Sequence, residues 1–362
     1  MRILLLAPSK SIHTQKWALF YKQNNIEVKV VTFADHYSED NASKVDTFVL
    51  PKLLPGKLAY FSGVRALKKL IQEYKPDILH SHYVSSYGLV GALTGFKPHF
   101  VSVWGRDIFQ FPLQNMLNKR LVQFTLKQAQ VICSTSKVMA EETNLYTNKN
   151  VYVTPFGVDL AKFRPIPHEK EKDSLVIGTV KALSDKYGIG DLIKAFSQVT
   201  KKYPEKDLSL LIIGDGPQRK EYEGLAAKLN IEEKTVFTGK VPNDDVPNYI
   251  NKMDIFAVPS TENSESFGVA AVEAMACGVP VVVSDVGGLP EVVKNGETGY
   301  VVPKESPDQL AEKFSYLIEN PQLKEKIGQQ AIQHVNNHYN WIDNANGMLE
   351  LYNQTLKKGM RS

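Results

Sequence analysis

Two carboxylates bracket a phenylalanine–glycine pair late in the chain, and these residue types suit the binding of a phosphate and of hydroxyl groups. Glu265, Phe267 and Gly268 end a polar loop, and Glu273 lies in the alanine-rich run that starts at Val269. The alanines predict a helix that begins just after Gly268. The first amide groups of a helix are unpaired and lie at the positive end of its dipole, so they attract a phosphate.

The spacing of the two glutamates indicates the shape of the ligand. Glu265 precedes the predicted helix, and Glu273 is about 7 Å further along the axis than Gly268, at roughly 1.5 Å per residue. We therefore predict a ligand with a diphosphate in its middle and hydroxyl groups at both ends. The alternative is that both glutamates are surface residues of an ordinary helix.

Two lysines follow a predicted strand over residues 175–180. Lys181 and Lys186 are five positions apart in the loop that comes next. A pair of cations at a strand end can neutralise a diphosphate, and it does so more strongly as the diphosphate leaves. The alternative is two solvated lysines in a surface loop.

The pattern Glu-x-Phe-Gly-x-x-x-x-Glu at 265–273 resembles the motif of the retaining, nucleotide-sugar-dependent glycosyltransferases with the GT-B fold, often called glycosyltransferase family 4. Residues 274–282 and 287–291 resemble the rest of that signature, and the resemblance is densest over residues 150–303. The family often has an arginine where this chain has Lys181, so a bidentate fork becomes a point charge.

The resemblance implies roles for individual residues. Glu265 would contact the donor sugar, and Glu273 would hold the ribose hydroxyls. The residues assigned to catalysis are Glu265, Lys181 and Lys186. Those assigned to the donor are Ser266, Phe267, Gly268 and Glu273, with Gly214 in a Gly-Asp-Gly turn and Val241 where the family holds the base.

The N-terminal half has polar and aromatic residues after its predicted strands, and we assign them to the acceptor side: Ser11, His13, His82, Trp104 and Asp107. Trp104 stands where many relatives have an active-site histidine, so that histidine's role does not carry over. Asp107 has the alternative of capping a helix. His80 and His82 alternate on one strand, but no further ligand has metal-site spacing, so we predict no metal.

Short apolar runs alternate with amphipathic segments along the whole chain. Runs at 3–7, 28–33, 77–81, 100–104, 131–134 and 150–154 form one series, and runs at 175–180, 208–213, 235–239, 254–258, 280–284 and 299–302 form a second. This alternation predicts parallel sheets of α/β class with ligands at the carboxyl ends of their strands. The resemblance implies two Rossmann-like GT-B domains facing each other across a cleft.

We expect an N-terminal acceptor-side domain over 1–165 and a nucleotide-sugar-binding domain over 166–341. The proline- and charge-rich stretch 164–173 is the expected linker. In similar proteins the last helix, about 342–362 here, packs back on the N-terminal domain. A length of 362 residues suits two such domains.

Composition limits where the chain acts. No apolar run reaches the roughly 20 residues of a membrane span, and the N-terminus does not have the pattern of a signal peptide. The two cysteines, Cys133 and Cys277, lie in apolar segments, as expected of buried thiols in a reducing compartment. We therefore expect a cytoplasmic protein.

The net charge of +4 conceals an asymmetry between the two halves. Residues 1–165 hold 21 Lys and Arg against 11 Asp and Glu, a balance of +10. That balance favours a surface that meets an anionic membrane, at the inner face of the plasma membrane, or a phosphorylated acceptor; a solvated basic face is the alternative. Residues 109–127, which mix Phe and Leu with basic residues, predict either a membrane-facing segment or a partly buried helix.

The resemblance implies a retaining hexosyltransferase, and the lack of an Asp-x-Asp motif fits a metal-independent one. The chain has no Asp-x-Asp motif and no G-x-G-x-x-G motif, and the latter weakens a nicotinamide dehydrogenase assignment. The donor would be a nucleotide-diphosphate sugar, a UDP-sugar by family habit, with no other cofactor. The acceptor would be a lipid-linked sugar or polysaccharide of the cell envelope, and no nucleic acid is involved. Alternatives are an epimerase or phosphorylase on the same fold, and an inactive binding partner of another transferase.

Overall fold

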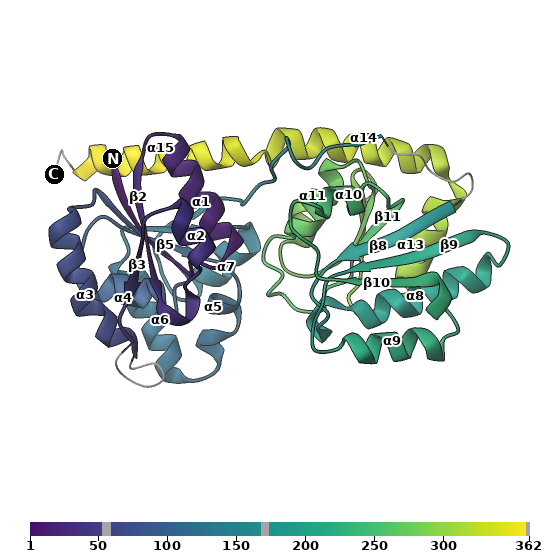
Figure 1. Ribbon diagram of the computed structural model, residues 1–362, viewed down its shortest axis with the longest axis horizontal. Helices are drawn as coiled ribbons and strands as arrows, with labels where there is room; N and C mark the ends of the chain where they lie inside the picture. The colour runs from purple at the N-terminus through teal and green to yellow at the C-terminus, as the bar shows by residue number, and fades with distance from the viewer. Residues whose placement is uncertain (53–58, 168–173, 360–362) are drawn as a thin grey trace. The chain divides into compact units, whose positions relative to one another are not determined.

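The computed structural model describes residues 1–52, 59–167 and 174–359, and these divide into two compact units (Figure 1). The first unit comprises residues 1–155 and the described residues from Ala345 onward, and the second comprises Phe156–Asn344. The division precedes the expected boundary at 165 because the backbone before that point is bound to the second unit. Val158 donates its N–H to the carbonyl of Tyr339, and Phe163 is buried. Residues 168–173 of the expected linker lie outside the described residues.

The first unit is a seven-stranded sheet in which every pair of neighbours is parallel. The strand order is β3-β2-β1-β4-β5-β6-β7. Its strands are β1 (Arg2–Leu6), β2 (Glu27–Phe33), β3 (Thr47–Leu50), β4 (Ile78–His82), β5 (His99–Val103), β6 (Val131–Ser134) and β7 (Val151–Val153). Its helices are α1 (Ile12–Gln23), α2 (Glu39–Lys44), α3 (Ala59–Tyr74), α4 (Tyr87–Thr94), α5 (Arg106–Phe109), α6 (Met116–Gln128), α7 (Lys137–Asn144) and α15 (Trp341–Gly359), with short 3-10 turns at Ala34–His36 and Phe111–Leu113.

The edge strand β3 is the one described strand of this sheet that the apolar runs did not predict. It is only four residues long and pairs with a neighbour on one side only, and its side chains are less buried than those of the central strands. Its residues Phe48 to Leu50 are apolar, as in the other strands, but this run is only three residues long and ends at Pro51.

The second unit is a six-stranded parallel sheet of order β10-β9-β8-β11-β12-β13. Its strands are β8 (Ser174–Val180), β9 (Asp207–Ile213), β10 (Thr235–Gly239), β11 (Ile255–Val258), β12 (Val281–Ser284) and β13 (Gly299–Val302). Its helices are α8 (Ile189–Lys202), α9 (Arg219–Lys228), α10 (Val246–Ile250), α11 (Val269–Ala276), α12 (Leu289–Val292), α13 (Pro307–Glu319) and α14 (Pro321–His338), with 3-10 turns at Asp185–Tyr187 and Glu232–Lys234. Both units therefore have the predicted α/β class with parallel sheets.

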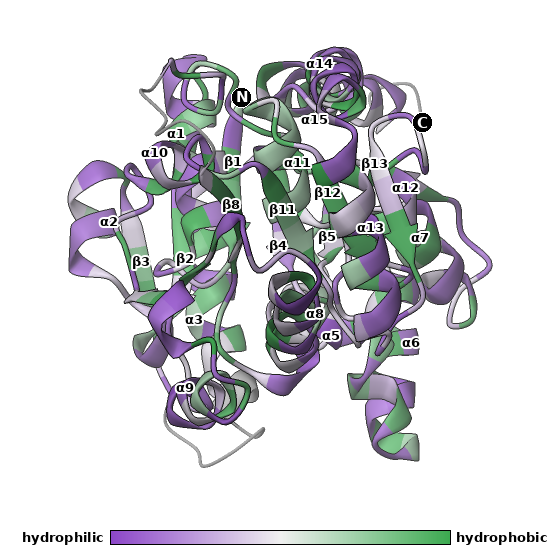
Figure 2. Cartoon of the chain, turned by 90° about the vertical axis from the view of Figure 1, so that its right-hand side faces the viewer, coloured by the Kyte–Doolittle hydropathy of each residue, from purple (hydrophilic) through white to green (hydrophobic). Residues whose placement is uncertain are grey.

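Apolar side chains from strands and helices fill the space on each sheet. Figure 2 shows strands such as β2 and β11 coloured as hydrophobic, while α2 is largely hydrophilic. Both cysteines are buried and free, as expected. Across the described ranges, no helix combines the length and the apolar composition that crossing a bilayer requires.

The last helix contributes to the core of the first unit. Figure 1 shows α15 lying along the unit that contains β1. Tyr352 of α15 is fully buried, and its hydroxyl lies 2.9 Å from the hydroxyl of Tyr21 and within hydrogen-bond distance of His80 Nδ1. His80 Nε2 is 2.7 Å from Ser102 Oγ. Burial lowers the pKa of His80 to about 3, so the imidazole in this row of hydrogen-bonded side chains is neutral at ordinary pH.

Candidate active site

The strand order of the second unit brings several of the predicted residues to one edge of its sheet. Lys181 follows β8, and Gly214 follows the neighbouring strand β9. On the other side of β8, the loop that follows β11 leads to Glu265. Because parallel strands end at the same edge, these loops are neighbours in space.

An ion pair joins two of the predicted catalytic residues. Lys181 Nζ lies 2.6 Å from Glu265 Oε2, and Ser260 Oγ donates to the same oxygen at 3.1 Å. The two side chains of the pair are only 11% and 10% exposed. Burial alone would raise the pKa of Glu265, but the charge of Lys181 and the hydrogen bonds from Lys181 and Ser260 hold that pKa below its ordinary value. The carboxylate is therefore ionised when the protein is folded.

An aromatic ring brings the second lysine to the same place. Tyr187 lies under both cations, with Lys181 Nζ 4.9 Å and Lys186 Nζ 4.5 Å from its ring centroid. The ring face attracts a cation, which helps to hold two like charges together. The carbonyl of Lys186 accepts the N–H of Thr261 at 2.9 Å, so the loop after β8 is tied to the loop after β11. Lys181, Lys186 and Glu265 thus form one cluster.

Glycines allow the loops to pack closely around this cluster. Gly214 has φ 135°, and a Cβ there would lie 2.0 Å from the carbonyl oxygen of Lys181. Gly287 has φ 52°, and a Cβ there would lie 2.1 Å from the carbonyl oxygen of Glu265. Gly288 donates its N–H to that oxygen at 2.9 Å. Gly214, assigned to the donor from sequence, therefore also positions Lys181, because no side chain fits between the two backbones.

Helix α11 begins where the sequence predicted it to begin. Gly268 is the N-cap with φ 85°, and no side chain caps the helix there. Phe267 is buried, with its ring centroid 6.1 Å from that of Phe156 and 5.5 Å from that of Tyr339. This packing fixes the end of α11 that has unpaired amide groups.

The other predicted donor residues lie near this end or at the same sheet edge. Ser266 is buried just before Phe267, and Glu273 is half-buried on α11 itself. Val241 is half-buried two residues after β10 ends. The residues that the resemblance gave to the donor thus come from the loops after β9, β10 and β11 and from α11, all of one unit.

Two side chains of the cluster were not predicted. Ser260 is fully buried and donates to Glu265, and Tyr187 supplies the shared ring. Ser260 comes two residues after β11, at the carboxyl edge where polar residues of a parallel sheet commonly meet ligands. Its position in the strand pattern was therefore a usable signal, whereas Tyr187 gave none.

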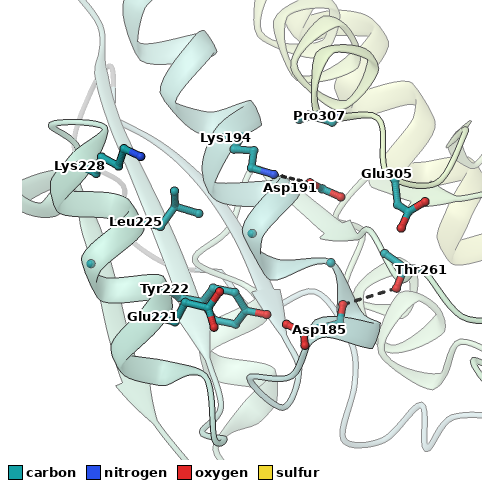
Figure 3. Close-up of a pocket in the computed structure, with 13 residues that line it drawn as sticks. Asp185, Asp191, Lys194, Glu221, Tyr222, Leu225, Lys228, Thr261, Glu305 and Pro307 are labelled. Carbon is teal, nitrogen blue, oxygen red and sulfur yellow. Dashed lines mark hydrogen bonds and ion pairs between the residues drawn. The ribbon is translucent and has the colours of Figure 1, made fainter.

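A separate pocket of about 850 Å³ lies in the second unit (Figure 3). Residues of α8 and α9 form much of its wall, with Asp185 and Tyr222 pointing into it. Its charged side chains are Asp185, Asp191, Glu221, Glu305, Lys194 and Lys228. Four carboxylates against two ammonium groups disfavour a diphosphate, and neither Lys181 nor Glu265 lines this pocket.

The first unit gathers most of its predicted residues into an aromatic cluster at the carboxyl edge of its sheet. The ring centroid of Trp104 lies 4.1 Å from that of His82, 5.8 Å from that of His13 and 5.1 Å from that of Tyr83. Burial lowers the pKa of His13 to about 4, with a further contribution from Lys16, and lowers that of His82 as well. Ser11 is the N-cap residue of α1, although its side chain forms no capping hydrogen bond.

Asp107 organises the loops of this edge. Its Oδ2 accepts the N–H of Val84 at 2.8 Å, and its Oδ1 accepts the N–H of Trp104 at 3.1 Å. Burial raises the pKa of Asp107 to about 6 despite these bonds. Both oxygens are directed to backbone groups, so the structure favours the capping type of role over direct contact with an acceptor. The N-cap position of α5 itself is Gly105.

Two family models match the two halves of the chain. Residues 2–136 match the model described as Glycosyl transferase 4-like, and residues 162–334 match the model described as Glycosyl transferases group 1. The chain belongs to the group 1 glycosyltransferases. The predicted enzyme class is thereby confirmed.

Known proteins resemble this glycosyltransferase over most of its length. An uncharacterised glycosyltransferase of Methanocaldococcus jannaschii is 27% identical over 342 residues, covering 93% of this chain and 92% of that protein. The N-acetyl-alpha-D-glucosaminyl L-malate synthase of Bacillus anthracis is 28% identical over 284 residues, covering 74% and 72%. The crystal structure of Anabaena HepE with UDP and glucose has a TM-score of 0.83 at 21% identity, covering 98% and 100%. This likeness confirms the predicted GT-B fold with two Rossmann-like units.

Proposed function

We propose that this glycosyltransferase moves a sugar from a UDP-sugar to a lipid-linked or polysaccharide acceptor with retention of the anomeric configuration. The observation that carries the proposal is the buried pair of Lys181 and Glu265. It lies in the same unit as the uncapped start of α11 at Gly268, on neighbouring loops of one sheet edge. One cation and a helix N-terminus suit a diphosphate, and one carboxylate suits sugar hydroxyls.

The reaction breaks the bond between the anomeric carbon and the diphosphate oxygen. Charge grows on the departing diphosphate, and Lys181, Lys186 and the first amide groups of α11 would stabilise it. The acceptor oxygen forms the new bond on the same face of the sugar, and its proton passes to the leaving phosphate oxygen. Glu265 would orient the donor sugar, and Glu273 would hold the ribose hydroxyls.

We further propose that no metal takes part. The described ranges contain no group of three or more His, Cys, Asp or Glu side chains with the geometry of a metal site. The lysines supply the positive charge that a divalent cation supplies in other transferases. Full activity after exhaustive chelation, and no gain on adding Mg²⁺ or Mn²⁺, would support this part of the proposal.

Two relatives support the choice of a nucleotide-sugar donor. HepE was solved with UDP and glucose, and the Bacillus anthracis relative carries an N-acetylglucosaminyl group in its name. The proposed setting is cell-envelope glycan synthesis in the cytoplasm, at the inner face of the plasma membrane, with no role for nucleic acid. The basic first half of the chain is the feature that supports an anionic partner.

A donor screen tests the proposal. Thermal unfolding is measured with UDP-, GDP- and ADP-sugars, and a ligand present at 100 times its Kd adds roughly 2.7 kcal/mol to stability. A UDP-sugar should stabilise the wild type and should stabilise the Lys181→Ala variant much less. Lys220→Ala is the matched control, since Lys220 is an exposed lysine of the same unit. Equal stabilisation of all three proteins would overturn the site.

Assays with the same purified protein distinguish the proposed function from its alternatives. Incubation of the protein with donor alone exposes an epimerase through a changed sugar, and incubation of a glycan with inorganic phosphate exposes a phosphorylase through release of a sugar phosphate. Donor binding without transfer to any of a panel of acceptors indicates an inactive binding partner. Transfer of the sugar with inverted configuration would contradict the proposed stereochemistry.

A further inference from the structure

The outer face of α6 carries large apolar side chains in water. Leu113, in the turn before α6, is 71% exposed, and Met116 and Leu117, in its first turn, are 62% and 64% exposed. Phe124, two turns later, is 36% exposed. We call these four side chains the α6 surface. A soluble protein seldom leaves so many large apolar side chains together without a partner for them.

The fold does not require these residues to be apolar. The opposite face of α6 already packs into the first unit through Val122 and Leu126, which are fully buried. At 100° per residue, Leu117 and Phe124 lie on the opposite side of the helix, roughly 140° to 180° from those two positions. The α6 surface is therefore additional to the core contact and serves another contact.

Basic residues flank the α6 surface along the chain, and this stretch of sequence has no acidic residue. Lys119, Arg120 and Lys127 are exposed on the same helix. The sequence contains no Asp or Glu at all from 108 to 140, while it has four Lys or Arg in that range. An apolar surface flanked by cations is complementary to an environment with an apolar interior and anionic groups at its boundary.

The start of α6 is held firmly. Asn115 Oδ1 accepts the N–H of Asn118 at 2.9 Å, which caps the helix. Asn118 Nδ2 donates to the carbonyl of Phe111 at 3.1 Å and to Gln114 Oε1 at 3.0 Å. Because these bonds fix the turn and the first helical residues together, Leu113 and Met116 are presented without a further ordering cost.

We propose that the α6 surface anchors the first unit to an anionic lipid bilayer. Leu113, Met116 and Leu117 enter the boundary between headgroups and acyl chains, while Lys119 and Arg120 bind lipid phosphates. A second copy of the chain is the less suitable occupant. Two copies meeting at this surface would bring together like charges from a segment that has no carboxylate to offset them.

The position of α6 would place a bilayer near the predicted acceptor side of the first unit. The chain leaves the carboxyl end of β5 at Val103, passes Trp104 and α5, and enters α6 from that side. The N-terminal end of α6 therefore follows closely on the sheet edge that holds the aromatic cluster of Trp104 and His82. An acceptor embedded in the bilayer would be presented to that edge. Lipid binding itself does not depend on the donor assignment.

Vesicle sedimentation of the full chain tests the anchor. Vesicles of equal parts phosphatidylglycerol and phosphatidylcholine are compared with vesicles of phosphatidylcholine alone. The wild type should bind the anionic vesicles, and added salt should weaken the binding. Lys119→Gln with Arg120→Gln should lower the partition coefficient about 30-fold, since each cation near the surface contributes about 1 kcal/mol, or roughly fivefold.

A second variant tests the apolar part, and matched controls exclude general effects. The triple change Leu113→Ser, Met116→Ser and Leu117→Ser should abolish sedimentation with either vesicle. Val236→Ser and the pair Lys220→Gln with Lys228→Gln change exposed residues of the second unit and should bind as the wild type does. All variants should unfold at the wild-type temperature, because each changes exposed side chains.

Three outcomes would overturn the anchor. The wild type fails to sediment with anionic vesicles, or the α6 variants sediment as well as the controls do. The third outcome is a wild-type dimer, seen by ultracentrifugation without lipid, that the triple variant does not form. That result would mean that the α6 surface binds a second copy of the chain.

Discussion

Replacing Lys181 by methionine should reverse the way Glu265 responds to pH. In the wild type the pKa of Glu265 lies below its ordinary value of 4.5, because the Lys181 charge and hydrogen bonds outweigh burial. Glu265 therefore contributes stability above about pH 4.5 and loses it as the pH falls through the lowered pKa. In Lys181→Met only the Ser260 bond and the more distant Lys186 oppose burial, so the pKa of Glu265 should rise above 4.5.

The magnitude follows from the burial of the pair. Lys181 and Glu265 are 11% and 10% exposed, so the carboxylate left in Lys181→Met is largely shielded from water. Removing one partner of a buried ion pair costs about 3 to 5 kcal/mol. The loss should be greatest at pH 8. It should shrink by at most about 1.4 kcal/mol per pH unit between the two pKa values of Glu265 as that carboxyl becomes protonated.

Hydrogen exchange under increasing urea measures this locally, which matters because two units need not unfold together. Mass spectrometry of peptides from β8 and α11 gives the free energy of opening in the second unit at pH 5, 6.5 and 8. Lys202→Met, which removes a cation from the exposed pair with Glu319, is the control and should have a far smaller effect. A loss for Lys181→Met below about 1 kcal/mol, or one that does not change with pH, would refute the reasoning.

Three further changes have defined expectations. Glu265→Ala should abolish transfer, whereas Glu273→Ala should mainly raise the donor Kd in calorimetry; full activity of both variants would contradict the site. Gly268→Ala, at φ 85°, should lower stability by about 1 to 3 kcal/mol in urea unfolding and weaken donor binding; an unchanged midpoint would count against it. Asp107, with its pKa raised to about 6, should make the wild type less stable as the pH rises from 4 to 7, and Asp107→Asn should flatten that slope; parallel profiles would disprove this.

Strand positions and the main cluster were open to prediction because they depend on local patterns. Strands buried on both faces need continuous apolar residues, and apolar runs located twelve of the described strands, the edge strands β7, β10 and β13 among them. The order of strands in a sheet then brings the ends of β8 and β11 together, and with them Lys181 and Glu265. Edge strand β3 carries a weaker form of the same signal, because its apolar run, Phe48 to Leu50, is only three residues long.

Contacts between distant segments were not open to prediction in the same way. Nothing in the sequence around Asp107 shows that its carboxylate would bind the N–H of Val84 from another loop. Ser260 was a candidate by its position after β11, but its hydrogen bond to Glu265, five residues later, depends on the path of the loop between them. The role of Gly214 beside the carbonyl of Lys181 likewise depends on how two loops meet.

The first unit cannot complete its folding during translation until the final helix, α15, has been synthesised. Its seven strands have all been synthesised by Val153, yet the tyrosine hydroxyl that Tyr21 and His80 share arrives 331 positions after Tyr21. Until translation reaches Tyr352, both polar groups lack this hydrogen-bond partner, and the surface that α15 will cover is left open. A nascent chain released before this point is therefore expected to contain an intact second unit and a destabilised first unit that is prone to degradation.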